Sequence, residues 1–125
     1  MRALGELEAS VMRAIWAHRR SATVRDIVVA LRRDRPVAYT TVMTVMDNLR
    51  RKGWLAREQD GRAYRYQPLV SAEDYSAAMM RRGLDASRDP AAALMLFIGE
   101  LSAEEASALE EAYRRITGTG PGGSR

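Results

Sequence analysis

The 125-residue chain carries a formal net charge of +4 and is long enough for one compact domain, or for one small domain with an appendage. Residues 1–70 have a net charge of +7 and residues 71–125 a net charge of −3, so only the first half suits a polyanion, unless its arginines form merely a solvated surface. The absence of cysteine excludes disulfides and thiolate metal or redox centres, and the single histidine, His18, argues against a histidine relay or metal cluster.

Three helices are predicted at the start of the chain. An apolar stripe predicts the first over residues 4–18. Thr23 is a good N-cap, because its hydroxyl can accept a hydrogen bond from a free backbone N–H, and a second helix is predicted over 24–33. The third helix lies within 38–53 and is closed by Gly53, which suits the position after a helix C-terminus.

The third helix has two chemically different faces. Its apolar residues recur at the spacing of one buried face: Val42, Val45, Met46 and Leu49. Its other face is polar and carries Thr40, Thr41, Thr44, Asn48 and Arg51. A hydroxyl-rich face that leads directly into a basic run at 50–52 indicates a surface built to contact something.

A β-hairpin is predicted next. Two short alternating segments, 54–58 and 63–67, flank Asp60 and Gly61, which together are a strong turn signal, and Pro68 ends the second strand. Three helices followed by a two-stranded hairpin predict a mainly α protein whose residues 1–70 form a winged helix-turn-helix. The third helix then occupies the reading position.

The C-terminal part is predicted to be helical and to dimerise. Capping signals predict helices over 71–84, 89–98 and 102–116, followed by a disordered glycine-rich tail at 118–125. These helices are too few to bury their own apolar residues, so we expect 71–117 to pair with a second copy about a two-fold axis. The residues expected in this interface are Met79, Met80, Leu84, Leu94, Phe97, Ile98, Leu101, Leu109 and Tyr113.

The winged helix predicts which side chains would meet DNA. The reading helix enters the major groove, where hydroxyls bond base edges and methyl groups meet thymine. Base contacts are expected from Tyr39, Thr40, Thr41, Met43, Thr44 and Asn48. Phosphate contacts are expected from residues at helix ends and on the wing, namely Ser21, Thr23, Arg25, Arg50, Arg51, Lys52, Arg62 and Arg65. Taken singly, Thr40 and Thr41 could equally be helix caps.

Two other functions stay open at this point. The Arg-rich face suits a winged-helix module that binds another protein, and the Met-rich C-terminal helices suit a regulator that senses a small-molecule effector. The sequence has no nucleophile–base pair, paired carboxylates or Gly-rich phosphate loop, so we do not expect an enzyme. With neither a signal peptide nor an apolar run near the roughly 20 residues that span a bilayer, we expect a cytoplasmic protein without direct membrane binding.

Four segments are distinctive: LGELEASVMRAIW, TVRDIVVAL, AYTTVMTVMDNLRRKGWL and GRAYRYQP. They resemble the corresponding segments of the BlaI/MecI family of penicillinase repressors, most densely over residues 4–68 and more loosely over the C-terminal half. The resemblance implies a homodimeric, double-stranded-DNA-binding repressor with an inverted-repeat operator, controlling β-lactamase-like or stress-response genes. It also implies that Thr40, Thr41 and Thr44 face the major groove while basic residues hold the backbone.

The resemblance has a further implication for induction. In the best-known members, a membrane sensor protease triggers cleavage before a phenylalanine that aligns with Phe97, and asparagine precedes that phenylalanine. This chain has Leu96 there, so the corresponding bond joins Leu96 to Phe97. The copper-responsive branch of the family uses a cysteine-rich site that this sequence does not contain, and we expect neither a metal nor another cofactor.

Overall fold

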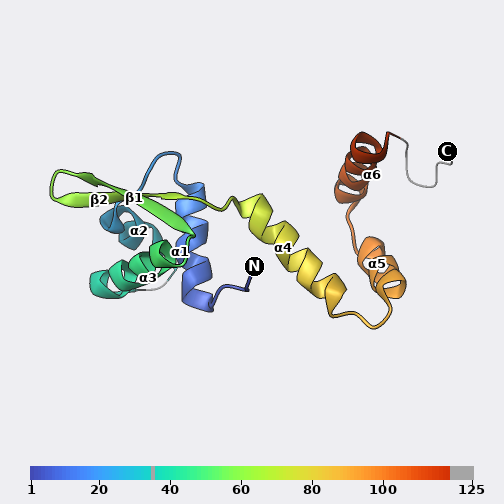
Figure 1. The fold of residues 1–125 in the computed structure, drawn as a ribbon, viewed down its shortest axis with the longest axis horizontal. Helices are drawn as coiled ribbons and strands as arrows, with labels where there is room; N and C mark the ends of the chain where they lie inside the picture. The colour runs from blue at the N-terminus through green and yellow to red at the C-terminus, as the bar shows by residue number, and fades with distance from the viewer. Residues whose placement is uncertain (35, 119–125) are drawn as a thin grey trace. The chain divides into compact units, whose positions relative to one another are not determined.

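The computed structural model describes residues 1–34 and 36–118, and in these ranges the chain forms six helices and one two-stranded antiparallel sheet (Figure 1). The elements in chain order are α1 (Glu6–Ala17), α2 (Val24–Leu31), α3 (Tyr39–Arg51), β1 (Leu55–Asp60), β2 (Ala63–Pro68), α4 (Ala72–Asp85), α5 (Pro90–Gly99) and α6 (Ala103–Thr117). The chain divides into two compact units at a point within α4. The first unit covers Met1–Met80 and the second begins at Arg81, and each is described by itself. No helix in the described ranges is long and apolar enough to cross a membrane.

The first three helices pack their apolar faces into one core. The predicted face of α3 is inside: Val42, Met46 and Leu49 are fully buried, and Val45 is partly buried. α1 and α2 contribute further buried residues, among them Met12 of α1. Because each fully buried aliphatic side chain stabilises the fold by about 1.5–3 kcal/mol, this core fixes the orientation of α3 and directs its polar face outward.

Local signals explain where these helices begin and end. The Thr23 hydroxyl accepts the Asp26 N–H at 3.1 Å and the Asp26 carboxylate accepts the Thr23 N–H at 2.9 Å, a complete capping box at the start of α2. α2 ends at Leu31, two residues before the predicted end, where the chain turns and the Asp34 N–H bonds the Leu31 carbonyl. Gly53 follows α3 with φ +87°, the left-handed conformation that glycine adopts without strain.

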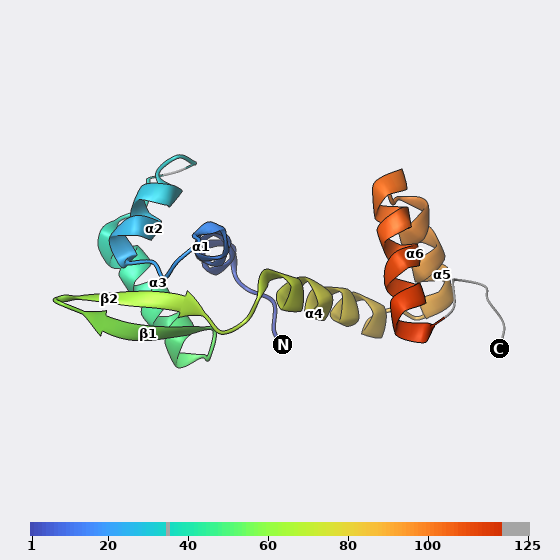
Figure 2. The ribbon, with the colours of Figure 1, turned by 90° about the horizontal axis from the view of Figure 1, so that it is seen from above.

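The hairpin forms the predicted wing, with a tighter turn than predicted. β1 and β2 pair from Leu55↔Pro68 to Asp60↔Ala63, so the strands continue to the turn and only Gly61 and Arg62 connect them. Gly61 has φ +65°, which permits this two-residue connection. The turn projects beyond α2 and α3 (Figures 1 and 2).

Backbone and aromatic contacts hold the hairpin and the residue before it against the helices. Ala22, between α1 and α2, exchanges two backbone hydrogen bonds with Tyr66 of β2, at 2.9 and 2.8 Å. Tyr75, near the start of α4, packs against Trp16 and Trp54, with ring centroids 6.0 and 5.5 Å apart, and its hydroxyl accepts the Leu4 N–H at 3.0 Å. The first turns of α4 therefore belong to the same packed unit as the winged helix.

The second unit has well-defined helix starts and an exposed apolar surface. Asp89 caps α5, and Ser102 forms the predicted capping box with Glu105 at the start of α6. α5 and α6 contain no buried residue in this monomer. Of the predicted interface residues in this unit, Leu84 and Leu101 are partly covered, and the exposed ones are Leu94, Phe97, Ile98, Leu109 and Tyr113. The other two predicted interface residues end the first unit, where Met79 is partly covered and Met80 is exposed.

The two remaining sequence predictions for this part concern the Leu96–Phe97 peptide bond and the C-terminal tail. Leu96 and Phe97 lie inside α5, with both side chains at least half exposed to solvent. Gly118 closes α6 with φ +77°. The rest of the predicted disordered tail, 119–125, lies outside the described residues.

Candidate nucleic-acid interface

A groove of about 1020 Å³ lies between the N-terminus of α2, the polar face of α3 and the hairpin. Five arginines and one aspartate line it, so its net charge is strongly positive. Nine of the predicted DNA-contacting residues meet there: Thr23, Arg25, Tyr39, Met43, Thr44, Asn48, Arg50, Arg51 and Arg62. The folding of the chain thus collects residues from four elements into one basic concave surface.

The threonines of α3 are exposed and do not cap the helix. The N-cap of α3 is Ala38, and no side chain caps this end. Thr40 and Thr41 are exposed, and within the described part of the chain their hydroxyls have no hydrogen-bond partner. The Thr44 hydroxyl donates to the Thr40 carbonyl at 3.0 Å, which leaves its oxygen available as an acceptor. These hydroxyls are therefore available to a ligand.

Apolar and amide groups extend the same surface. Tyr39 and Met43 are 50% and 43% exposed, although both are large and could have been buried. Asn48 is also exposed and lines the groove one turn after Thr44. A face that offers hydroxyls, an amide and a thioether suits the mixed polar and methyl edges of base pairs in a major groove.

Asp47 connects three arginines of the groove. Its Oδ1 accepts hydrogen bonds from Arg50 Nε and Nη2 at 3.3 and 2.9 Å, and it lies 3.5 Å from Arg57 Nη1. Its Oδ2 lies 3.0 Å from Arg51 Nη2. The hydrogen bond from Arg50, followed by the charges of the neighbouring arginines, lowers the pKa of Asp47, so the carboxylate is ionised at neutral pH.

Arg57 and Tyr64 belong to the groove, although the sequence analysis did not select them. The Arg57 guanidinium carbon lies 3.9 Å from the centre of the Tyr64 ring, a cation–π contact between neighbouring strands of the hairpin. Asp47 was also missed, but its spacing of three and four residues from Arg50 and Arg51 is a readable signal for helical ion pairs. The arrangement of Arg57 and Tyr64 depends on the strand register, which spacing alone does not give.

Two basic residues of the groove are available to bind a ligand. Arg25, in the first turn of α2, and Arg62, in the hairpin turn, are exposed and line the groove. Neither makes an ion pair or hydrogen bond within residues 1–34 and 36–118. Both are therefore available for contacts with phosphate groups.

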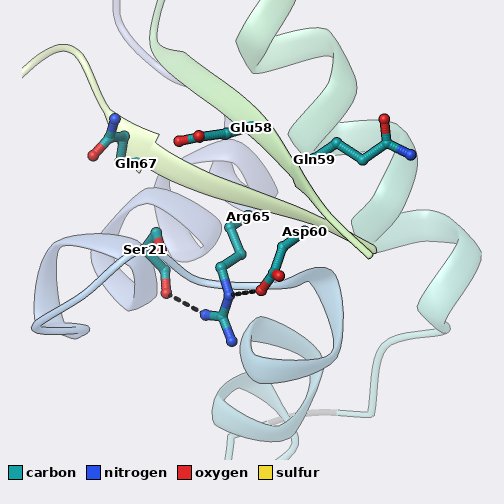
Figure 3. A pocket seen from close by; sticks show the side chains of 6 residues that line it. All are labelled: Ser21, Glu58, Gln59, Asp60, Arg65 and Gln67. Atoms are coloured by element: carbon teal, nitrogen blue, oxygen red, sulfur yellow. Dashed lines mark hydrogen bonds and ion pairs between the residues drawn. The ribbon is translucent and has the colours of Figure 1, made fainter. Parts of the chain in front are cut away.

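Five predicted residues lie outside the lining of the groove. Thr40 and Thr41 are on the exposed start of α3, and Lys52 pairs with Glu8 at 3.3 Å. Arg65 donates to Asp60 at 2.7 Å and to the Ser21 carbonyl at 3.1 Å, within a separate pocket of about 280 Å³ (Figure 3). In the structure Arg65 and Ser21 thus fasten the hairpin to the α1–α2 connection.

The three helices, the wing and the basic groove on the reading helix together define a winged-helix DNA-binding protein. Residues 4–115 match the penicillinase repressor family, and the chain belongs to that family. It is 38% identical over 116 residues to the transcriptional regulator BlaI of Mycobacterium tuberculosis, covering 90% of this chain and 84% of that protein. These relatives are transcriptional regulators rather than enzymes, in agreement with the sequence analysis.

Solved structures support the same fold. The DNA-binding domain of the repressor BlaI is 28% identical, with a TM-score of 0.52, and the match covers 58% of this chain and 87% of that one. The monomeric form of Bacillus licheniformis BlaI in complex with the blaP half-operator is 27% identical, with a TM-score of 0.50, covering 59% of this chain and 89% of that one. The winged helix predicted from the sequence is confirmed, and the chain is a transcriptional repressor of the BlaI family.

Proposed function

We propose that the protein is a homodimeric repressor in which two winged helices bind the two halves of an inverted-repeat operator. The observation that carries the proposal is the basic groove, where Arg25 and Arg62, both without a side-chain partner among the described residues, flank the polar face of α3. Base contacts then come from the six predicted residues of α3, and Thr44 is the one whose free oxygen faces the groove. The arginines contact the phosphates on either side.

The second unit supplies the dimer in this proposal. Phe97 and Ile98 of α5 and Tyr113 of α6 are about half exposed, and Met95 is 75% exposed. Such a concentration of apolar surface on two short helices is costly in water and is relieved when an identical copy covers it. The Bacillus licheniformis relative binds a half-operator in its monomeric form, which supports one winged helix per half-site here.

Selection from a random duplex library tests the proposal. The full chain is incubated with the library at near-physiological salt, and bound DNA is sequenced over several rounds. We expect an inverted repeat whose half-sites are about 10 base pairs apart, or a small multiple of that distance. A single unrepeated motif would contradict the dimer, and recovery of no motif would contradict sequence-specific binding.

A variant of α5 distinguishes dimerisation from DNA reading by the winged helix. Phe97→Glu places a charge on the proposed interface, and we expect sedimentation to show a monomer that retains the half-site preference with weaker affinity for the full repeat. Glu104→Gln, at the exposed start of α6, is the matched control and should leave the dimer intact. An unchanged dimer for Phe97→Glu would place the interface elsewhere.

A further inference from the structure

The carboxylate of Asp47 is an unexpected group on a surface that meets DNA. Among the residues that line the groove it is the only acidic one. It lies on the reading helix one turn after Thr44, and its side chain is 25% exposed. A negative charge at this place repels every phosphate that approaches, so its presence requires a compensating role.

Direct reading of a base does not account for Asp47. An aspartate can accept a hydrogen bond from the amino group of cytosine, but only with a free oxygen. Here Oδ1 is engaged by Arg50 and lies near Arg57, while Oδ2 is engaged by Arg51. In the free protein both oxygens are directed to guanidinium groups, so we infer that Asp47 acts on the arginines before it acts on a base.

The arginines around Asp47 differ in freedom. Arg50 and Arg57 are 31% and 28% exposed, and Arg57 is also held over the Tyr64 ring. Arg51 is 68% exposed and reaches Asp47 through one nitrogen. Arg50 and Arg57 are thus fixed in position, whereas Arg51 can exchange the carboxylate for a phosphate.

The same contacts join the reading helix to the wing. Asp47 lies on α3, Arg57 on β1 and Tyr64 on β2, so an unbroken line of side-chain contacts crosses the groove. We propose that Asp47 is a positioning residue that holds the groove arginines in one arrangement and thereby sets how strongly the protein prefers its operator over other DNA. This inference rests on the proposed function.

The proposal has a specific energetic consequence. On the operator, phosphates lie where Arg50 and Arg57 already point, so these arginines bind them without rearranging. Their attraction for the phosphates then compensates for the repulsion by Asp47. On other DNA the phosphates meet the groove in less favourable positions, and the repulsion by Asp47 remains. Asp47 therefore weakens binding to unrelated DNA more than binding to the operator.

Asp47→Asn tests this consequence, because it removes the charge and keeps the size. Affinities are measured for the duplex obtained by selection and for a shuffled duplex of the same length, from about 200 to about 50 mM salt. A dimer carries two Asp47 residues, so we expect the variant to gain up to about 12-fold in affinity for the shuffled duplex over this range, the effect of about two more neutralised phosphates, without the same gain on the selected duplex. The preference for the selected duplex should fall by about threefold or more, since threefold corresponds to one of the two carboxylates, and an unchanged preference would overturn the proposal.

Two further variants separate position from charge. Asp85→Asn is the matched control, since Asp85 pairs with Arg81 at 2.8 Å on α4 and does not line the groove, and it should leave the preference unchanged. Arg57→Lys keeps the net charge but loses the planar contacts with Asp47 and Tyr64. A fall in preference for Arg57→Lys supports the positioning role, and no fall overturns it.

A measurement without DNA distinguishes this inference from the proposed function. In the free protein the Arg50 Nε–H donates to Asp47 Oδ1, so nitrogen-15 NMR should show it protected from exchange with water in the wild type and unprotected in Asp47→Ala, which removes the acceptor oxygen. Equal exchange in both proteins would overturn the positioning role. If instead the wild type prefers neither duplex, the proposed operator binding fails, while this measurement still decides whether Asp47 holds the arginine.

Discussion

Arg62 gives the sharpest test of how the wing contributes to binding. It lies in the two-residue turn of the hairpin, lines the groove and has no ion pair or hydrogen bond in the described part of the chain. An unpaired guanidinium that meets one phosphate releases about 0.9 counterions, and a dimer has two such wings. Arg62→Ala should therefore make the negative slope of log affinity against log salt less steep, by about 1.8.

The expected effect is large enough to measure by fluorescence anisotropy. When the salt concentration rises fourfold, the wild type should lose about 12 times more affinity than Arg62→Ala, because the two slopes differ by about 1.8. The variant should be weaker at low salt on selected and shuffled duplexes alike, because a phosphate contact carries no sequence information.

A charge-matched control separates the wing from overall charge. Arg88→Ala, between α4 and α5, removes the same charge from a residue that does not line the groove, and it should leave the slope near that of the wild type. Parallel salt plots for the wild type and Arg62→Ala would refute the phosphate contact. A loss confined to the selected duplex would make Arg62 a reader of bases instead.

Three other predictions concern the reading helix and the packing behind it. Thr44→Val removes the free hydroxyl oxygen and keeps a methyl group, so it should reduce discrimination between selected and shuffled duplexes by about 1–3 kcal/mol in competition binding. An equal loss of affinity for both duplexes would show that Thr44 does not read a base. Tyr75→Phe removes the hydroxyl that accepts the Leu4 N–H and should lower the free energy of unfolding in urea by about 1 kcal/mol, whereas an unchanged midpoint would show that the bond contributes nothing. A hydrogen bond from the Gly5 backbone is the main cause that lowers the pKa of Glu8 below its ordinary value of 4.5. The ionised carboxylate therefore stabilises the fold above pH 4.5, and this stabilisation is lost as the pH falls through the lowered pKa. Glu8→Gln should flatten the loss of stability below pH 4.5, and identical acid unfolding curves for the two proteins would contradict it.

Much of the fold follows from local sequence signals. The apolar spacing of Val42, Met46 and Leu49 predicted the buried face of α3, and the structure buries all three. Gly53 and Gly61 predicted the end of α3 and the hairpin turn, and both have the positive φ values that such positions require. These features depend on residues close together in the chain, which is why sequence periodicity and turn chemistry identify them.

Other features depend on residues that only folding brings together. The sequence predicted Arg65 as a phosphate contact, but its spacing could not reveal that Asp60 and the Ser21 carbonyl would bind its guanidinium. The cation–π contact of Arg57 with Tyr64 likewise needs the strand register. Chemistry of the single residue predicts an affinity for phosphate, but the neighbours in space decide whether the charge is available.

Intermolecular NMR contacts show most directly whether the polar face of α3 reads bases. Threonine methyl groups are labelled in the full chain, which is mixed with the half-site found by selection. We expect contacts from the methyl groups of Thr40, Thr41 and Thr44 to base protons in the major groove. Contacts only to sugar protons, or none from these methyl groups while DNA is bound, would contradict it.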